Sequence, residues 1–210
     1  IIDDPNTSLM TSRFGTRKDR TPGDVYWDLF RRGNQNRSSG NTEAIWVAQM
    51  ETDIQGGMIS TSGYWYGNNL ERYHVPAIWT LDDPDGNAGF LGYVGDANSG
   101  GRGVSFMMPT DFFIDELWQR SGFDTDIRNA DHNFKRSLQY TNPNSAYYGM
   151  SALDNRGEII DNEVWRWYPW LTKVTTPKNH PDALYLDKEH WLLKNTAGST
   201  FRDMYYLRLA

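Results

Sequence analysis

The chain of 210 residues contains no cysteine, which excludes a disulfide scaffold, a thiolate metal site and a cysteine nucleophile. It has no long apolar run, so we expect no segment to span a membrane. Lysine and arginine total 21 against 27 aspartates and glutamates, which gives a net charge of −6. Proteins that bind nucleic acids usually carry a basic patch or a high pI, so this balance argues against a nucleic-acid partner.

The sequence also lacks the standard catalytic signatures, including HExxH, G-x-S-x-G, a Walker loop and a dinucleotide fingerprint. His180 and His190 are close in sequence, but their spacing fits no common zinc pattern. The turn from Asp82 to Asn87 offers several oxygens to a calcium ion, yet its spacing fails the EF-hand rule, which favours a solvated turn. We therefore expect no metal and no cofactor.

The carboxylates show no evident acid–base pair. Asp115 and Glu116 are adjacent on an expected helix and point in different directions. Residues 121–136 (SGFDTDIRNADHNFKR) place three aspartates around Arg128, which indicates a carboxylate–guanidinium network. We expect no enzyme, although two facing carboxylates of a glycoside hydrolase stay open as an alternative.

Aromatic side chains are abundant: 9 Trp, 12 Tyr and 9 Phe make up 14% of the chain. Such rings fill gaps in loop-rich cores, and they also form sugar-binding surfaces, because the apolar face of a pyranose stacks on Trp and Tyr. Residues 63–79 (GYWYGNNLERYHVPAIW) set rings among Gly, Asn and Arg, with no sustained apolar period. That setting suits a sugar, whose hydroxyls pair with planar polar groups, and a packed loop anchored by its rings is the alternative.

The candidate ligand-binding residues in this stretch are of two kinds, and they are assigned from local composition. The rings expected to stack on the sugar are Trp65, Tyr66 and Trp79. The side chains expected to hydrogen-bond its hydroxyls are Asn68, Asn69 and Arg72. The same rings could instead dock on another protein, which makes a protein-interaction module a further alternative.

Few segments carry regular secondary-structure signals. Residues 22–34 predict a short helix capped by Asp24, and residues 109–122 predict another that begins at Thr110 and ends at Gly122. Residues 43–50 (EAIWVAQM) read as a buried strand, and residues 163–168 as a weaker one. Most of the rest is turn chemistry.

The C-terminal stretch TFRDMYYLRLA predicts the first turns of a helix. Thr200 and Asp203 have the spacing of a capping box, and no Gly or Pro follows. The segment is apolar nearly all round, which indicates a buried helix that continues beyond Ala210. The N-terminal IIDDPNTSLM holds no start Met or leader. We therefore expect residues 1–210 to form a single partial domain, truncated at both ends.

Four sequence blocks, in order, resemble the SusD/RagB family. GDVYWDLFRRGNQNRSSGNTEAIWVAQM resembles the family's helix, turn and N-x-E-x-I strand, matched by Asn41, Glu43 and Ile45. PTDFFIDELW with DTDIRNADHNFKR, WYPWLTKVTTP, and GSTFRDMYYLRLA resemble three later blocks. The family's ligand-contacting rings lie in variable loops and do not transfer by motif. We read the charged residues of these blocks as scaffold groups that tie loops to helices: Glu43, Arg128, Lys173, Arg202 and Arg208.

The resemblance implies an outer-membrane lipoprotein, exposed on the cell surface, that takes part in polysaccharide utilisation and nutrient uptake. It would bind an oligosaccharide or polysaccharide without cleaving it and pass it to a SusC-like TonB-dependent transporter. Its only membrane association would be a lipid anchor that lies outside this chain. The implied fold is mainly α with extensive irregular loops and a few short strands. This chain would be the loop-rich part of a SusD-like fold built on tetratricopeptide-like (TPR-like) helix pairs, most of which lie outside it.

Overall fold

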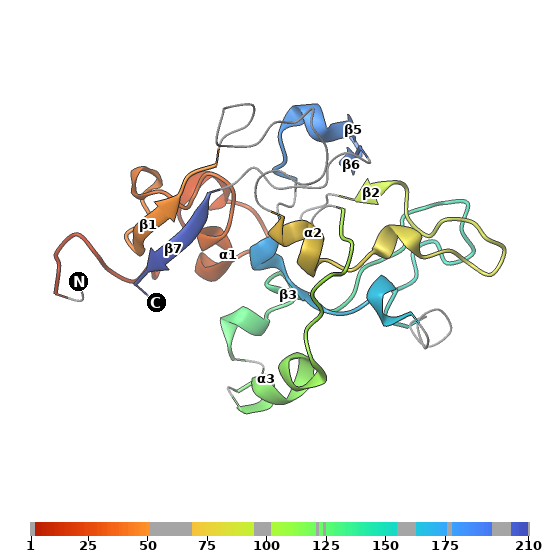
Figure 1. Cartoon of the computed structure of the whole chain (residues 1–210), viewed down its shortest axis with the longest axis horizontal. Helices are drawn as coiled ribbons and strands as arrows, with labels where there is room; N and C mark the ends of the chain where they lie inside the picture. Colours follow the sequence, from red (N-terminus) through yellow and green to blue (C-terminus); the bar gives the residue numbers. More distant parts are fainter. Residues whose placement is uncertain are drawn as a thin grey trace.

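Figure 1 shows the chain in a computed structural model, which describes residues 3–50, 69–94, 102–120, 122–123, 125–154, 163–175, 178–194 and 203–209. Its α-helices in these residues are short: α1 spans Val25–Leu29, α2 Leu70–His74 and α3 Leu117–Arg120. A π-helical turn, Phe112–Glu116, leads directly into α3. No helix in these ranges is long and apolar enough to cross a membrane.

Single 3-10 turns interrupt the connections. They are Gly15–Arg17, Arg37–Ser39, Ile78–Thr80, Ile127–Asn129, Val164–Arg166, Thr172–Val174 and Asp182–Leu184.

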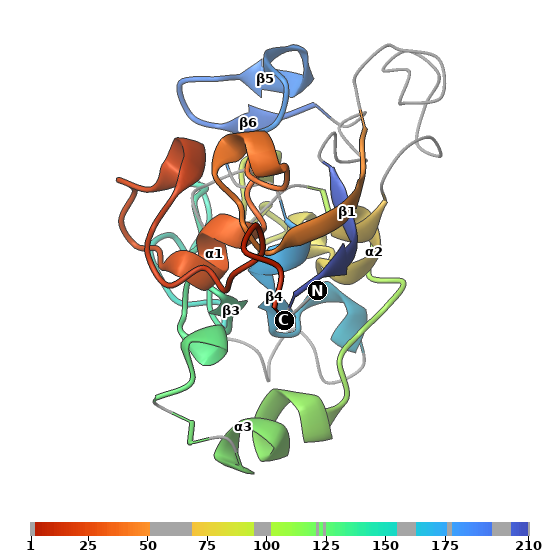
Figure 2. The ribbon, with the colours of Figure 1, turned by 90° about the vertical axis from the view of Figure 1, so that its left-hand side faces the viewer.

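The described strands form three small antiparallel sheets. β1 (Ala44–Ala48) pairs with β7 (Met204–Arg208), and β3 (Phe134–Lys135) pairs with β4 (Trp170–Leu171). The third sheet has the order β2-β6-β5. Its strands are Tyr93–Val94, Leu192–Leu193 and Tyr185–Asp187. Figures 1 and 2 show α3 and the β5–β6 hairpin at opposite ends of the molecule.

The expectation of a mainly α fold built on TPR-like helix pairs is wrong. The three α-helices that the structure describes have five residues or fewer, and no two of them form an antiparallel pair. Helices this short are unstable alone, because the free energy needed to nucleate a helix exceeds what the hydrogen bonds of a single turn contribute. α1 persists here because Asp24 caps it and because its residues Trp27, Asp28 and Leu29 are buried against other segments.

The C-terminal segment is a strand where a helix was predicted. β7 pairs with β1 over Ala44↔Arg208, Trp46↔Leu207 and Ala48↔Met204. Helix propensity is a weak preference of a few tenths of a kcal/mol per residue, and a strand partner overrides it. Asp203 does not serve as a first-turn acid, because its carboxylate accepts hydrogen bonds from the Asn36 side chain and the Met50 amide.

Predictions that rest on local capping are confirmed. Asp24 accepts a hydrogen bond from the Trp27 amide at 2.8 Å and caps α1. Thr110 accepts one from the Phe113 amide at 3.3 Å, and Gly122 adopts φ +73° where the second helix was predicted to end. The strand predicted at 43–50 is β1, but it is only partly buried. The strand predicted at 163–168 is wrong, because a 3-10 turn occupies Val164–Arg166.

Much of the aromatic excess lies in the core. The main cluster brings together aliphatic and aromatic side chains from residues 75–90, 138–152 and 167–170. Trp167 and Trp170 are fully buried, with their ring centroids 5.6 Å apart and nearly perpendicular. Large rings fill the space between irregular segments that long helices or broad sheets would otherwise fill.

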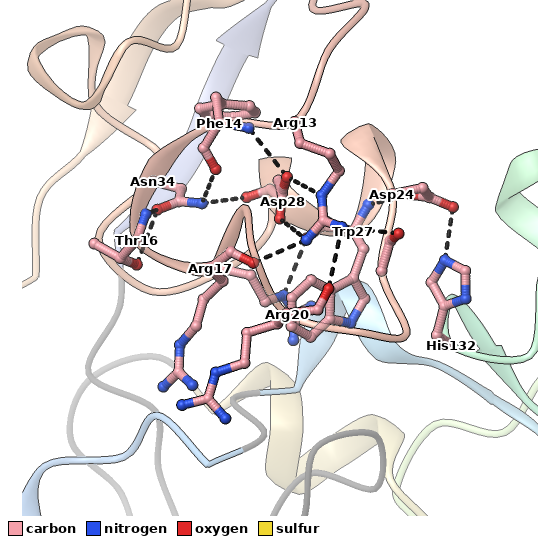
Figure 3. A network of polar contacts seen from close by, with 12 residues as sticks. Arg13, Phe14, Thr16, Arg17, Arg20, Asp24, Trp27, Asp28, Asn34 and His132 are labelled. Carbon is pink, nitrogen blue, oxygen red and sulfur yellow. Dashed lines mark hydrogen bonds and ion pairs between the residues drawn. The ribbon is translucent and has the colours of Figure 1, made fainter.

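The N-terminal third is organised around the buried carboxylate of Asp28 (Figure 3). Arg13 donates to it through Nε at 2.5 Å and Nη2 at 3.0 Å, and the Phe14 amide donates at 3.1 Å. The same guanidinium also donates to the carbonyl oxygens of Arg17, Arg20 and Gly23. One ion pair therefore fixes the whole loop before α1 onto the helix.

We predict that Asp28→Asn lowers the free energy of unfolding by about 3 kcal/mol, the usual cost of removing one partner from a buried ion pair. Urea unfolding followed by tryptophan fluorescence measures the change. Asp19→Asn, at an exposed site in the same loop, is the matched control and should unfold like the wild type. Equal stability of the two variants would contradict the organising role of Asp28.

Candidate functional site

The structure places three of the six predicted ligand-binding residues. Asn69 is half-buried at the N-cap position of α2, Arg72 is buried within α2, and Trp79 is half-buried in the 3-10 turn Ile78–Thr80. The other predicted residues, Trp65, Tyr66 and Asn68, lie outside the described residues.

Trp79 belongs to a compact group that we call the Trp79 cluster: Trp79, Tyr93 and Arg102. The indole N–H of Trp79 donates to the carbonyl of Gly103 at 2.8 Å. The Tyr93 ring meets the indole edge to face, with centroids 5.3 Å apart. The Arg102 guanidinium lies 5.4 Å from the Trp79 centroid and 4.9 Å from that of Tyr93. All three side chains are partly exposed.

The segment that carries Arg102 is pressed against α2 and the residues that follow it. The Val104 amide donates to the Arg72 carbonyl at 2.8 Å, and the Met107 amide donates to the Tyr73 carbonyl at 2.9 Å. A Cβ at Gly103 would lie 2.1 Å from the Val75 carbonyl oxygen, so only glycine allows this approach. The segment that carries Arg102 therefore packs so closely on the residues after α2 that no side chain fits at Gly103.

The three-stranded sheet continues the line of rings. Tyr93 of β2 packs with Trp191 against the small buried group of Leu184, Tyr185 and Leu193. The Tyr185 and Trp191 rings meet edge to face with centroids 5.5 Å apart. Two partly exposed rings, Tyr93 and Trp191, thus pack against one small hydrophobic group.

A buried hydrogen bond attaches this sheet to α2. His180 Nε2 lies 2.8 Å from Glu71 Oε1, and both side chains are almost fully buried. The His180 amide also donates to the Tyr185 hydroxyl at 3.3 Å. An ionised carboxylate only accepts hydrogen bonds, so His180 must carry a proton on Nε2 and donate it to Glu71. This bond fixes the loop before β5 against the helix that carries Asn69 and Arg72.

The two histidines that the sequence places close together have separate roles. His190 is exposed, and its Nδ1 lies 2.7 Å from Asp187 Oδ2, whose hydrogen bond raises the pKa of the imidazole. His180 is buried against Glu71. Within the described residues, no group of three or more His, Asp or Glu side chains is placed to hold a metal ion.

Backbone strain concentrates around the same site. In the part of the chain that the structure describes, the non-glycine residues with positive φ are Ser105, Lys178 and Trp191, at +60°, +47° and +58°. Ser105 follows the segment that holds Arg102, and Lys178 Nζ lies 5.3 Å from the Trp191 centroid. A left-handed tryptophan is a genuine outlier, and such strain typically marks functional sites.

The aspartate-rich turn uses its oxygens internally. Asp83 is buried, and its carboxylate accepts hydrogen bonds from the amides of Asp85, Asn87 and Ala146 and from the Asn87 side chain. The carboxylate that is most enclosed therefore binds main-chain N–H groups. These bonds, led by that from Ala146, lower the pKa of Asp83 from 3.8 to about 2.

We predict that Asp83 contributes to acid stability. Its folded pKa lies below the unfolded value, so its stabilisation is complete above about pH 4 and is lost as the pH falls towards 2. Asp83→Asn should lower the melting temperature at pH 6 and flatten its decline between pH 4 and 2. Thermal melts at half-unit pH steps measure this, with Asp85→Asn, an exposed neighbour, as control. Parallel pH profiles for wild type and Asp83→Asn would contradict it.

A hollow of about 340 Å³, which we call the Asp24 hollow, is lined by Asp24, Asp126 and Asp131 among other residues. Asp126 forms the predicted ion pair with Arg128. Asp131, predicted beside Arg128 as well, pairs with Lys135 at 3.0 Å instead, and Asp124 lies outside the described residues. Burial raises the pKa of Asp24, but hydrogen bonds from His132, the Trp27 amide and Asn133 outweigh burial and lower it. A carboxylate held ionised is a poor general acid, so this hollow suits an ion-pair network better than glycoside hydrolysis.

Comparison of the chain with protein-family models, curated proteins and solved structures finds no match. The SusD/RagB resemblance therefore stays an expectation based on the sequence motifs. Sequence reasoning missed Tyr93, Arg102 and Trp191 as members of the site. Gly103 ends the glycine-rich run SGGRG, which reads as a turn, so the sequence held no signal that marked this glycine as a point of close backbone approach.

Proposed function

We propose that this protein captures a glycan at the Trp79 cluster and binds it without chemical change. The observation that supports this best is a partly exposed Trp–Tyr pair joined to a guanidinium, beside a backbone so closely packed at Gly103 that no Cβ fits. Rigid rings lose little conformational entropy when a ligand binds, so a platform fixed in advance favours affinity.

The chemistry of a sugar matches the groups in the cluster. A pyranose has an apolar C–H face, which stacks on Trp79 or Tyr93, and a rim of hydroxyls, which pair with planar donors such as Arg102. Asn69, at the start of α2, stays a predicted hydrogen-bonding partner on the ground of sequence composition. Arg72 is buried, and we assign it to holding α2 in place instead of contacting the ligand. Trp65, Tyr66 and Asn68 lie outside the described residues and stay predicted ligand contacts on the ground of sequence composition.

The motif resemblance gives this binding a biological setting. We propose that the protein is exposed at the outer membrane of a Gram-negative bacterium, is held there by a lipid anchor outside this chain, and passes oligosaccharide to a SusC-like TonB-dependent transporter. The carboxylates of the Asp24 hollow are engaged with His132, Arg128 and Lys135, which supports binding over hydrolysis.

A docking surface for another protein is the second candidate function, and one surface feature favours it. The three consecutive residues Phe106, Met107 and Met108 are all exposed, and Phe106 has 63% of its surface accessible. Beside them lies an apolar groove of about 360 Å³ lined by Phe113, Trp170 and other residues. Flexible methionines beside a groove are typical of protein-binding surfaces. The transporter is the partner that the motif resemblance suggests for this surface.

We predict that Trp79→Ala weakens glycan binding about tenfold, the effect of losing a contact worth about 1.4 kcal/mol. A glycan array identifies the ligand first, and isothermal titration calorimetry of the variant follows. Because Trp79 also holds Gly103, circular dichroism and a thermal melt must show that the variant is folded. Tyr93→Ala is the second variant, which removes a ring without removing that hydrogen bond.

Trp165→Ala is the matched control, since Trp165 is an exposed tryptophan outside the cluster with an arginine over its ring. It should bind like the wild type. Full binding by folded Trp79→Ala and Tyr93→Ala would remove this site assignment. No response from the wild type to any glycan would remove the proposed function itself.

A further inference from the structure

The outer face of the β1–β7 ribbon carries a second pair of rings. Trp46 has 59% of its surface exposed and Tyr206 has 71%, and their ring centroids lie only 4.2 Å apart. Leu207, which pairs with Trp46 where the strand register is irregular, is also exposed. Tryptophan is strongly buried on average, so an exposed indole in contact with an exposed phenol calls for an explanation by function.

The inner face of the ribbon is tightly fixed, which holds these rings outward. The Tyr205 hydroxyl donates to the Leu29 carbonyl at 2.6 Å and hydrogen-bonds the Asn41 side-chain amide. At the end of the ribbon, Arg208 Nη1 lies 2.5 Å from Glu43 Oε2, and the Leu209 amide donates to the Glu43 carbonyl, so this end is anchored as well. Because side chains alternate along a strand, fixing Tyr205 inward directs Tyr206 to solvent.

Planar polar side chains lie beside the rings. A hollow of about 360 Å³ is lined by Trp46 together with Asn36, Arg37 and Gln49. The Gln49 amide donates to Asn36 Oδ1 at 3.1 Å, and Asn36 Nδ2 donates to Asp203. Two carboxamides and a guanidinium held in order beside an indole match the face and the hydroxyl rim of a sugar.

The charges around the ribbon favour a neutral ligand. Arg37 donates to the carbonyls of Ala44 and Asn6, and the Asp203 carboxylate accepts from Asn36 and the Met50 amide. Arg208 is paired with Glu43. Because these charges already have partners inside the protein, they add little binding free energy for an acidic polymer or a phosphate. An uncharged sugar does not depend on such charges for its affinity.

We infer that the Trp46–Tyr206 face is a second carbohydrate platform, and that the natural ligand is a neutral polysaccharide long enough to use two platforms. Figure 1 shows the β1–β7 ribbon at one side of the molecule and β2, which carries Tyr93, toward the other. The same ribbon faces the viewer in Figure 2. Two weak sites on one polymer reinforce each other through effective concentration, which short oligosaccharides cannot exploit. This inference rests on the proposed function.

The test compares a polymer with its fragment. Wild type is run in native affinity gels containing amylopectin, xyloglucan, galactomannan or arabinan, and a hexasaccharide from the polymer that retards it is titrated by calorimetry. Trp46→Ala and Tyr206→Ala should each weaken polymer binding about tenfold and leave hexasaccharide affinity at the Trp79 cluster unchanged. Trp79→Ala should weaken both. Leu186→Ala, an exposed apolar residue on β5, is the matched control and should change neither.

Three results would overturn the inference, and they differ from failure of the proposed function. If polymer binding survives in folded Trp46→Ala and Tyr206→Ala but falls in Trp79→Ala, the Trp79 cluster alone binds the polymer and the ribbon is no carbohydrate platform. A dimer that light scattering detects in the wild type and not in Tyr206→Ala, with polymer binding unchanged, assigns the ribbon to self-association. An equal loss of hexasaccharide binding in Trp46→Ala makes the ribbon structural. A wild type that no polymer retards and no hexasaccharide binds removes the proposed function, and the second platform with it.

Discussion

The buried hydrogen bond between His180 and Glu71 is the contact on which the candidate site depends. It joins the loop before β5 to α2, two segments separated by more than a hundred residues. Through α2 it fixes the segment that carries Arg102, and through β5 and β6 it fixes Tyr93. A polar group that is removed from water must keep its partner, so this contact specifies one arrangement of the two segments.

The same constraint recurs throughout the fold, because a chain with so few helices and strands leaves many main-chain groups without ladder partners. Buried polar side chains supply them. Asn34 accepts from the Thr16 amide and donates to the Asp28 carbonyl, Asn41 donates to the carbonyls of Asn34 and Gln35, and Arg31 donates to the Thr172 carbonyl. Each bond is modest alone, but each prevents a buried carbonyl or amide from being left unpaired. This explains why residues that usually lie on the surface are among the most buried here.

Sequence reasoning succeeded where the deciding interaction is local. Asp24 and the Trp27 amide are three residues apart, so capping chemistry alone predicts where α1 begins. It failed where the deciding partner is distant. Met204–Arg208 has helix-forming residues, but its partner is β1, some 160 positions earlier, and pairing with that strand decides the outcome.

The same distinction applies to the candidate site. Composition indicated Trp79 and its neighbourhood, because rings among turn-forming residues are unusual in a core. It could not place Tyr93 and Arg102 beside Trp79, since their approach depends on Gly103 passing the Val75 carbonyl. Nor could it predict that Arg72 would be buried, because helix position alone does not say which face a later segment covers.

A loop-rich fold of this kind has one physical advantage for carbohydrate recognition. Sugars offer weak, directional hydrogen bonds that compete with water, so affinity depends on rings and planar groups that are ordered before the ligand arrives. At the Trp79 cluster that order comes from the indole hydrogen bond to Gly103 and from the main-chain bonds that hold this segment on α2. At Trp46 and Tyr206 it comes from an inner ribbon face that is held by Tyr205 and from a ribbon end that is held by Glu43. Contacts of the backbone and of neighbouring side chains thus order both places although regular secondary structure is sparse, and two proposed platforms on one chain would favour a long, neutral polymer over a small sugar.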